Sequence, residues 1–301
     1  MATIDFSDGD TDVAAWHRQG GRERLVGYYR LRAIVNTVLA AVLGVIFVWP
    51  FLCIVGATFN RIDVWMNPLL PIPVQFSTKL YELMVTRYHF HRYIWNSVVV
   101  VFTSTALSVF ASSLAGYALA KCEFPGRNVL FVIILGIMML PGQTMIVSRF
   151  VVMRQLKLVN NYWGLILPAV GGGAGGIFLM RQFMLGVPTE MLEAARIDGA
   201  NEFTLFLRVV LPIMKAPLGV MTTLSVQGGW NALLWPQILI TDEAKMLLMP
   251  AIARQNRLIG IDPYALPAVW AAALTGALLP LALYAYSQKN FVSAMAGAVK
   301  M

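Results

Sequence analysis

The chain has 301 residues, of which 58% are hydrophobic and only 13% are charged. Soluble chains average roughly 45–50% apolar and about 25% charged residues, so this composition excludes both a soluble globular protein and a disordered one. The net charge of +8 does not by itself indicate nucleic-acid binding, because membrane proteins carry basic residues beside their helices. The composition predicts an integral membrane protein.

The first 30 residues precede the first long apolar run. They contain four aspartates and no apolar core, so they lack the pattern of a cleavable signal peptide. Basic residues near the first span favour the cytoplasmic side. Five arginines lie before or at its start: Arg18, Arg22, Arg24, Arg30 and Arg32. We therefore expect a cytoplasmic N-terminal segment over 1–30, followed by a membrane domain over 31–290.

Long apolar runs predict six transmembrane helices, since a helical crossing needs about 20 apolar residues. The runs cover 33–59, 95–120, 129–149, 162–183, 209–236 and 266–288. Backbone groups in lipid must be hydrogen-bonded internally, and the sequence lacks the alternation that is typical of barrel strands. The predicted fold class is an all-α integral membrane protein with six transmembrane helices, with both termini in the cytoplasm and a cytoplasmic tail over 291–301.

Glycines are concentrated in the fourth predicted span, where 171–176 holds five glycines in six residues. One interpretation is a bend or an unwound stretch that lines a pathway, which would have to face protein or water. The other is close helix packing through small residues. Under the first interpretation, Gly172 and Gly173 are candidate pathway residues.

The predicted spans contain no Asp or Glu, the usual device of a proton- or sodium-coupled carrier. The phosphate-binding motif G-x-x-x-x-G-K-[ST] is also absent. Two cysteines, Cys53 and Cys122, are too few for a disulfide framework or a zinc site. We therefore expect no catalytic residues, no metal and no cofactor in this chain, and an energy source in a separate subunit.

The loop over 186–207, between the fourth and fifth spans, predicts a helix, a turn and a second helix. Thr189 is expected to cap the first helix, Glu190 to favour its positive end, and Gly199 to stop it in a left-handed conformation.

Two further features of this loop concern its surface. Ala194 and Ala195 leave one flank of the first helix smooth, so another surface can approach it closely. Glu193 and Arg196 lie three residues apart, where they can pair with each other or with a partner.

The same loop carries the residues of a known motif. Glu193, Ala194 and Ala195, then Asp198, Gly199 and Ala200, and finally Leu211 and Pro212 resemble the EAA loop of ABC importer permeases. The resemblance to the carbohydrate-importer branch, and within it to the maltose-type second permease subunit, covers nearly the whole chain after residue 30. Its other motifs include 116–121 with 124–126, 139–141, 164–168, 178–183, 230–236 and the tail from 291 to 300.

This resemblance implies the fold of a type I ABC importer permease in the bacterial inner membrane. It implies four further subunits: a second, homologous permease, two ATP-binding cassette subunits that hold ATP and Mg, and an extracytoplasmic substrate-binding protein. The EAA loop would dock on an ATPase subunit, and the segment after Gln288 would run between the ATPase subunits. The coupling residues that it implies are Glu190, Glu193, Ala194, Ala195, Asp198 and Gly199.

Candidate substrate contacts are aromatic, because the C–H faces of sugar rings stack on π surfaces. Trp230, Trp235 and Tyr264 are such residues, with Asn231 beside the first and Trp163 as a further candidate. Most aromatic residues of membrane proteins lie in interfacial belts or in packing, which is the alternative for each of them.

The predicted outer segments are basic. Their ten cationic residues are Arg61, Lys79, Arg87, Arg92, Arg149, Arg154, Lys157, Lys245, Arg254 and Arg257, and their five acidic residues are Asp63, Glu82, Asp242, Glu243 and Asp262. Such a surface would attract an anionic sugar, either a uronate oligosaccharide or a sugar phosphate, or would dock an acidic binding protein. The alternative functions are a secondary carrier and a membrane scaffold. Under either one, the EAA resemblance would be a coincidence.

Overall fold

The computed structural model describes residues 9–61, 72–171, 173–257, 261–262 and 264–299, with side chains from residue 31 to residue 288 within these ranges. The chain divides into two compact units, Met1–Phe76 and Ser77–Met301. In the described residues the regular elements are helical, apart from one isolated bridge between Asn60 and Phe76.

The first unit contains one long helix, α1 (Gly9–Thr58). Its stretch Leu31–Thr58 is apolar enough to cross a membrane, which confirms the first predicted span. After this helix the chain turns back on itself, where the Phe59 and Phe76 rings stack with centroids 5.5 Å apart. Most large apolar side chains of α1 are exposed in the unit by itself, as expected for a surface covered by lipid or another subunit.

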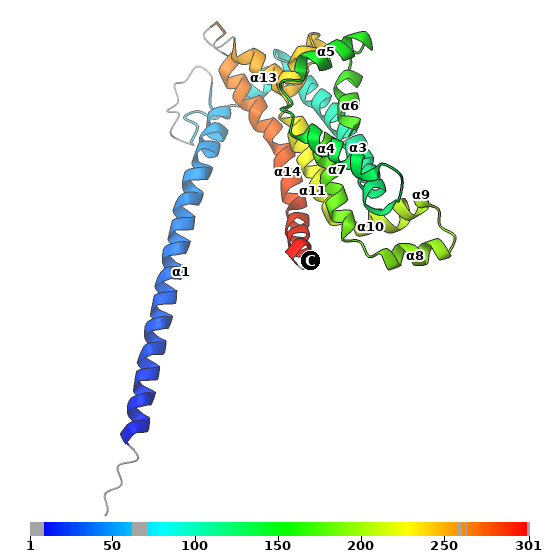
Figure 1. Ribbon diagram of the computed structural model, residues 1–301. Helices are drawn as coiled ribbons and strands as arrows, with labels where there is room; N and C mark the ends of the chain where they lie inside the picture. The colour runs from blue at the N-terminus through cyan, green and yellow to red at the C-terminus, as the bar shows by residue number, and fades with distance from the viewer. Residues whose placement is uncertain (1–8, 62–71, 172, 258–260, 263, 300–301) are drawn as a thin grey trace, which may run out of the picture. The chain divides into compact units, whose positions relative to one another are not determined.

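The second unit is built around α3 (Figure 1). Its helices are α2 (Lys79–Thr86), α3 (Phe90–Lys121), α4 (Arg127–Met138), α5 (Ile146–Gln155), α6 (Trp163–Val170), α7 (Gly173–Leu185), α8 (Thr189–Ile197), α9 (Glu202–Thr204), α10 (Leu211–Ile213), α11 (Lys215–Trp230), α12 (Leu234–Leu239), α13 (Leu248–Asn256) and α14 (Ala265–Val299). A π-helical segment, Leu205–Val210, joins α9 to α10, and a 3₁₀ turn, Glu243–Lys245, precedes α13.

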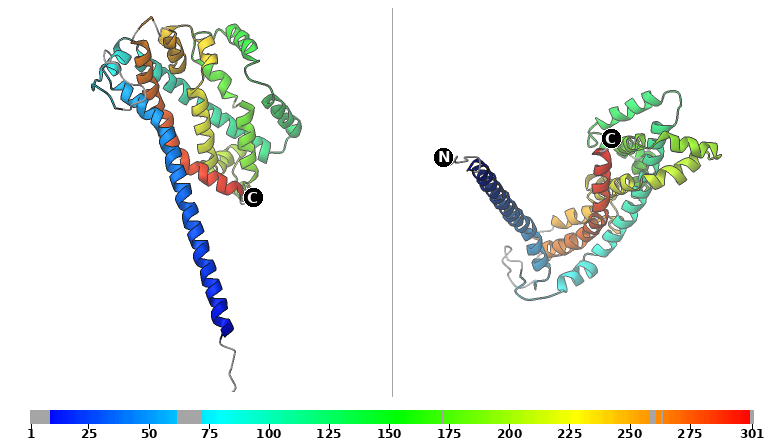
Figure 2. Two further views of the ribbon diagram at one scale, coloured as in Figure 1. Left: turned by 90° about the vertical axis from the view of Figure 1, so that its left-hand side faces the viewer. Right: turned by 90° about the horizontal axis from the view of Figure 1, so that it is seen from below.

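Small residues on α3 let its neighbours approach closely. Ser112 and Ser113 are fully buried, and a Cβ atom added to Gly116 would lie 2.9 Å from the backbone nitrogen of Arg181 in α7. This is the packing device of membrane helices, whose backbones meet where side chains are small. Helices α6 and α11 also pack on α3, and α14 lies alongside α11 (Figure 2).

Two buried apolar clusters lie toward opposite ends of α3. The cluster at its start includes Phe90 and Tyr93 and is completed by α11, α13 and α14. The cluster at its end includes Tyr117 and is completed by α7, α8, α11 and the π-helical segment. The two ends of α3 are therefore packed by different sets of helices, with α11 contributing to both.

The predicted number of six spans is not confirmed. Among the described residues, four helical stretches are long and apolar enough to cross a membrane: Leu31–Thr58, Phe90–Lys121, Trp163–Leu185 and Ala265–Gln288. A fifth span results if Glu202–Ile213 and Lys215–Trp230, which meet at an angle of 84°, are taken as one broken crossing. The predicted span 209–236 is therefore not one straight helix.

The predicted third span, 129–149, is corrected by the structure. It is divided between α4, which ends at Met138, and α5, which begins at Ile146. Pro141 and Gly142 lie in the intervening turn, where proline disfavours helical geometry in the residue before it. A helix of 12 residues is about 18 Å long, well short of a hydrocarbon core about 30 Å thick.

The glycine run interrupts the fourth span. Helix α6 ends before Gly171, and α7 begins at Gly173 with a φ of 56°, while Gly172 lies outside the described residues. A Cβ atom on Gly173 would meet nothing within 4 Å, whereas one on Gly176 would lie 2.5 Å from Cε of Met221. The run thus combines a helix break at its start with close packing at its end.

Candidate functional site

Helix α8 is amphipathic and lies near the end of α3 (Figure 1). Leu192 faces inward and is 1% exposed, in the same cluster as Phe206. Glu190, Glu193 and Ala194 are exposed. One face of the helix is therefore anchored by packing, while the other is open to a partner.

The start of α8 differs from the prediction by one residue. The position before the helix is held by Pro188, which is extended at φ −59° and ψ 132°, and Thr189 is the first helical residue. No side chain caps this end, so the prediction of Thr189 as the cap is wrong. The proline ring fixes φ, and the next residue can therefore enter the helix directly.

The end of α8 is fixed by Gly199, as predicted. Its φ of 86° lies in the left-handed region, and a Cβ atom there would meet nothing within 4 Å. The Ala200 amide donates to the Ala195 carbonyl at 3.1 Å, and the Gly199 amide donates to the Arg196 carbonyl at 3.0 Å. These two bonds form a Schellman motif, which satisfies carbonyls that the helix leaves free. The need for glycine is therefore conformational rather than steric.

The Glu202 carboxylate connects this loop to α3. The Tyr117 hydroxyl of α3 donates to Oε2 of Glu202 at 2.6 Å, and Arg196 Nε of α8 donates to Oε1 at 3.0 Å. The thiol of Cys122 lies 3.7 Å from Oε2, and burial raises the pKa of this thiol, which keeps it neutral. One carboxylate thus binds side chains from two separate elements.

The pair of Arg196 with Glu193, one of the two predicted alternatives, is not formed in the structure. The ion pair of Arg196 is with Glu202, and the hydrogen bond raises the pKa of its guanidinium. Glu193 has no hydrogen bond or ion pair within the part of the chain that the structure describes, and its side chain is exposed. Glu193 is therefore available to a partner.

The contact between Glu202 and Tyr117 was not predicted from the sequence. The local signal for Glu202 is its position after Asn201, whose side chain caps α9 by accepting from the Thr204 amide at 2.8 Å. Tyr117 lies 85 residues away in the sequence, so no local pattern relates the two. A second bond connects the end of α3 to this loop. Lys121 Nζ donates to the carbonyl of Val187, which lies just before α8, at 2.6 Å.

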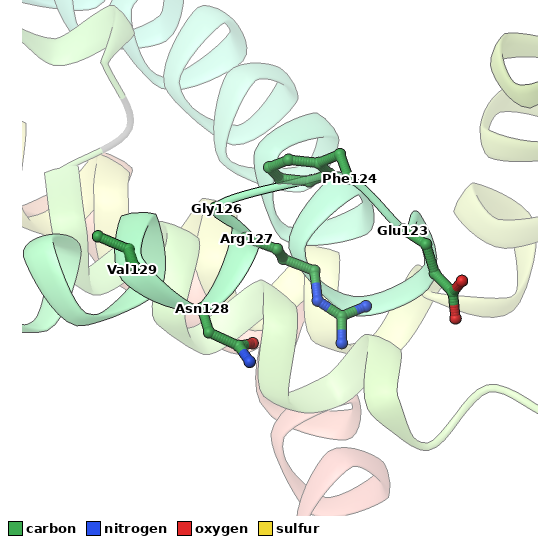
Figure 3. Close-up of a pocket in the computed structure, with 6 residues that line it drawn as sticks. All are labelled: Glu123, Phe124, Gly126, Arg127, Asn128 and Val129. Atoms are coloured by element: carbon green, nitrogen blue, oxygen red, sulfur yellow. The ribbon is translucent and has the colours of Figure 1, made fainter.

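The turn after α3 forms an open hollow of about 350 Å³ near this loop (Figure 3). Its lining comes from one short segment: Glu123, Phe124, Gly126, Arg127, Asn128 and Val129. Arg127 Nη1 donates to the Cys122 carbonyl at 3.1 Å, and Gly126 has a φ of 83°. A hollow of this origin is a bend in the surface rather than a chamber between helices.

The candidate pathway residues do not form one cluster. Trp230 is 5% exposed in the core at the start of α3, while Trp235 of α12 packs on the cluster formed with α3, α5 and α6 and lies under the Arg149 guanidinium at 4.6 Å. Asn231 is exposed, and its amide donates to the Gln227 carbonyl. Tyr264 lies under Arg87 at 5.4 Å. Their contact with substrate stays a prediction, as does that of Trp163, which is 53% exposed.

Several charges predicted to be outward are paired with one another. Arg87 bonds Asp262 at 3.1 Å, Arg254 bonds Glu243 at 3.1 Å, and Lys245 lies 3.9 Å from Asp242. Asp63 lies outside the described residues. These pairs leave the net charge of the outer segments unchanged, but fewer of their cationic side chains are unpaired than the count of ten indicates.

The Asp262 carboxylate is the most strongly held of these groups. The Tyr88 hydroxyl donates to it at 2.6 Å, and this bond lowers the pKa of Asp262. Burial and the same bond raise the pKa of Tyr88. The group connects the residues directly after α2 to the segment before α14.

Comparison with known proteins identifies the family. Residues 108–293 match the model of the binding-protein-dependent transport system inner membrane component. The arabinooligosaccharides transport system permease protein AraQ of Bacillus subtilis is 30% identical over 221 residues, which cover 72% of this chain and 78% of the relative. The sn-glycerol-3-phosphate transport system permease protein UgpE of Escherichia coli is 33% identical over 213 residues, covering 69% and 75%.

A solved structure supports the same conclusion for the fold. The crystal structure of a bacterial ABC transporter involved in the import of the acidic polysaccharide alginate contains a chain with a TM-score of 0.76 and 24% sequence identity, covering 86% of this chain and 96% of that one. The predicted resemblance to importer permeases is confirmed. The chain belongs to the family of inner membrane components of binding-protein-dependent transport systems.

Proposed function

We propose that this chain is the permease subunit of an ATP-driven, binding-protein-dependent importer that moves a carbohydrate across the bacterial cytoplasmic membrane. The observation that carries the proposal is α8, which is anchored by Leu192 and exposes Glu193 and Ala194. An exposed helix with a smooth flank and a free carboxylate is suited to dock in a cleft of an ATPase subunit. The named activities of the related permeases support the same assignment.

The proposed assembly contains a second, homologous permease, two ATPase subunits that bind ATP and Mg, and an extracytoplasmic substrate-binding protein. The side of the second unit that bears α8 would face the cytoplasm. Helix α14 ends toward that side (Figures 1 and 2), which supports a cytoplasmic C-terminus. The arginines before the first span support a cytoplasmic N-terminus. The opposite side, with α2, α5 and α13, would face the binding protein.

The test of this function is reconstitution. The chain, its companion permease, the ATPase subunits and the binding protein are placed in liposomes, and uptake is measured with and without ATP. We expect uptake only with ATP, and ATPase activity that rises with liganded binding protein. Uptake driven by an ion gradient without an ATPase would establish a secondary carrier instead. Failure of any ATPase to assemble with the chain would also overturn the proposal.

For the cargo, we propose an anionic saccharide, either a uronate oligomer or a sugar phosphate. The support is the excess of basic residues at the end that would face outward, where Arg257 is exposed and has no ion pair among the described residues. Attraction by such a surface is long-ranged but is screened within about 8 Å at physiological salt. Because Lys245 and Arg254 already have acidic partners, we expect steering rather than a fixed ion pair.

The cargo is tested with one binding protein and two ligands, one charged and one neutral. Import of the charged ligand should weaken as salt rises and when Lys245, Arg254 and Arg257 are neutralised together. The neutral ligand should show neither effect. Equal salt dependence for both ligands would overturn the anionic cargo and assign these charges to docking of the binding protein.

A further inference from the structure

The segment between α8 and the π-helical segment has a fixed backbone. Its start is set by the left-handed Gly199, and its end is set by Asn201, whose side chain caps α9. Glu202 is the first residue of α9, directly after that cap. The carboxylate is therefore presented from a defined backbone position rather than from a mobile loop.

Apolar packing already holds α8 and α3 near each other. Tyr117 is 2% exposed and lies against the fully buried Phe206, with ring centroids 5.5 Å apart, and Leu192 of α8 belongs to the same cluster. Burial of apolar surface is non-directional, so it tolerates sliding of one element over the other. Packing alone does not fix the angle between α8 and α3.

Hydrogen bonds to a carboxylate are directional and roughly twice as strong as neutral ones. Glu202 accepts such bonds from Tyr117 of α3 and from Arg196 of α8, one on each oxygen. Both oxygens are thus engaged by different elements, and rotation of α8 against α3 would break one bond or the other.

From this geometry we propose that Glu202 is a positioning residue that locks α8 to the end of α3, so that the two move as one body when the ATPase subunits close. The inference rests on the proposed function, because α8 is driven by an ATPase only in such an importer. It assigns the transfer of motion from the coupling helix into the membrane to a residue that is not among the named residues of the EAA motif.

The first test measures a distance and needs no cargo. Spin labels are placed at Glu123, just after α3, and at the exposed Ile197 of α8, in the assembled complex with Cys53→Ser and Cys122→Ala. Alanine is chosen at 122 because serine would place a hydroxyl donor near Glu202. We expect one narrow distance that ATP binding leaves unchanged. With Glu202→Gln or Tyr117→Phe, the distribution should broaden at least twofold and shift on ATP binding. An unchanged distribution in both variants would overturn the proposal.

The second test measures transport per ATP. The cargo probes are an arabino-oligosaccharide, an alginate oligosaccharide and glycerol 3-phosphate, of which the one imported by the wild-type complex is used. We expect Glu202→Gln to retain ATPase activity while uptake per ATP falls roughly tenfold, the effect of losing one charged hydrogen bond. The double variant with Tyr117→Phe should be no worse than Glu202→Gln alone, since the two act through one bond.

A matched control exists at the other end of α3, where Tyr93 donates to Glu243 at 3.2 Å and Glu243 pairs with Arg254. Tyr93→Phe with Glu243→Gln removes the same chemistry from the same helix. It should leave the distance between α8 and α3 unchanged. Equal broadening in this control would mean that Glu202 serves general stability, and the proposal would fall.

Two outcomes separate the proposal from the function on which it rests. If the wild-type complex shows no ATP-dependent uptake, the proposed function fails. If uptake is normal and Glu202→Gln keeps both the narrow distance and the uptake per ATP, only the locking role fails. Should Glu202→Gln not assemble, Tyr117→Phe decides, because it keeps the ring against Phe206 and removes only the hydroxyl.

Discussion

The two ends of α3 carry the same three kinds of side chain in the same arrangement. At its start, Tyr93 donates to Glu243 at 3.2 Å, and Arg254 pairs with that carboxylate at 3.1 Å. At its end, Tyr117 donates to Glu202 at 2.6 Å, and Arg196 pairs with it at 3.0 Å. In both cases a tyrosine of the central helix holds an acidic residue from a loop.

The ends differ in what surrounds this group. At the start of α3, Asn96 donates to the carbonyls of Ala244 and Met246, both at 3.0 Å, and the Ser97 hydroxyl accepts from the Leu248 amide at 2.8 Å. The loop there is held to α3 by these three hydrogen bonds in addition to the bond from Tyr93 to Glu243. At the other end, the described side-chain bonds to the loop over 186–207 are those of Tyr117 and Cys122 to Glu202 and that of Lys121 to the Val187 carbonyl. The start of α3, here called the fixed end, thus has four bonds spread over Tyr93, Asn96 and Ser97. Two of the three bonds at the other end meet at one carboxylate, so that end depends more on a single group.

Among the variants that test this comparison, Gly199→Val should have the largest effect on uptake. A non-glycine residue at a φ of 86° costs about 1–3 kcal/mol, and a β-branched one is a strong outlier there. We expect loss of ATP-dependent uptake although the chain still inserts. The control is Gly126→Val, because Gly126 has a φ of 83° and equally open space around it. If both variants lose uptake equally, strain anywhere at this end is sufficient and the turn after α8 has no special role.

Glu193→Lys should have the next largest effect. It reverses an exposed charge on α8, and like-charge contact across an interface is costly. We expect uptake and co-purification of the ATPase to fall several-fold, more at low salt than at high salt. Glu82→Lys is the matched reversal of an exposed charge on α2 at the other end, and it should leave co-purification of the ATPase unchanged. Wild-type rates of uptake and of stimulated ATPase activity in Glu193→Lys would contradict the role of α8.

The middle of α3 gives a third point of comparison, where α7 crosses it. A Cβ atom on Gly176 would lie 2.8 Å from Oγ of Ser112 in α3, so Gly176→Ala should lower the thermal stability of the complex through overpacking.

Gly172→Ala with Gly173→Ala instead opposes the helix break, and we expect slower uptake with assembly preserved. Unchanged uptake kinetics in that double variant would leave close packing as the role of the glycine run.

Hydropathy and turn chemistry predicted much of this fold. The first span, the α3 span and the last span follow from uninterrupted apolar runs. The left-handed end of α8 follows from Gly199, because few other residues adopt that conformation. These features are local in the sequence, and so is the EAA motif on which the proposed coupling residues rest.

The features that the sequence did not predict arise where two local signals compete or where the interacting residues lie far apart in the sequence. The run 129–149 is apolar enough for a span, but Pro141 and Gly142 divide it. Thr189 does not cap α8, because Pro188 occupies the position before the helix. The pairing of Tyr117 with Glu202 could not be predicted, since it depends on how α3 packs against a loop 85 residues further along the chain.

The smallest expected effect is at the fixed end, where pH acts on Asp262. The bond from Tyr88 lowers the pKa of this carboxyl, so the ionised form stabilises the contact between α2 and the segment before α14. A lowered pKa gives stability that is present above the ordinary value and is lost as pH falls through the lowered one. Partly exposed ion pairs contribute at most about 1 kcal/mol, and the Arg87 side chain is 49% exposed. We therefore expect amide exchange in α2 to rise modestly below about pH 4, the ordinary range of an aspartate.

Two variants at this site show whether the carboxylate is responsible. Asp262→Asn should exchange faster already at pH 7 and show little further change on acidification, because the charge is gone at every pH. Tyr88→Phe should move the wild-type transition to higher pH, since it removes the hydrogen bond that holds the pKa down. Exchange in α8 should not follow either variant, because the end of α3 that holds it has its own carboxylate. If α8 loosened together with α2, the two ends of α3 would be one cooperative unit, and the contrast between a fixed end and a moving end would be wrong.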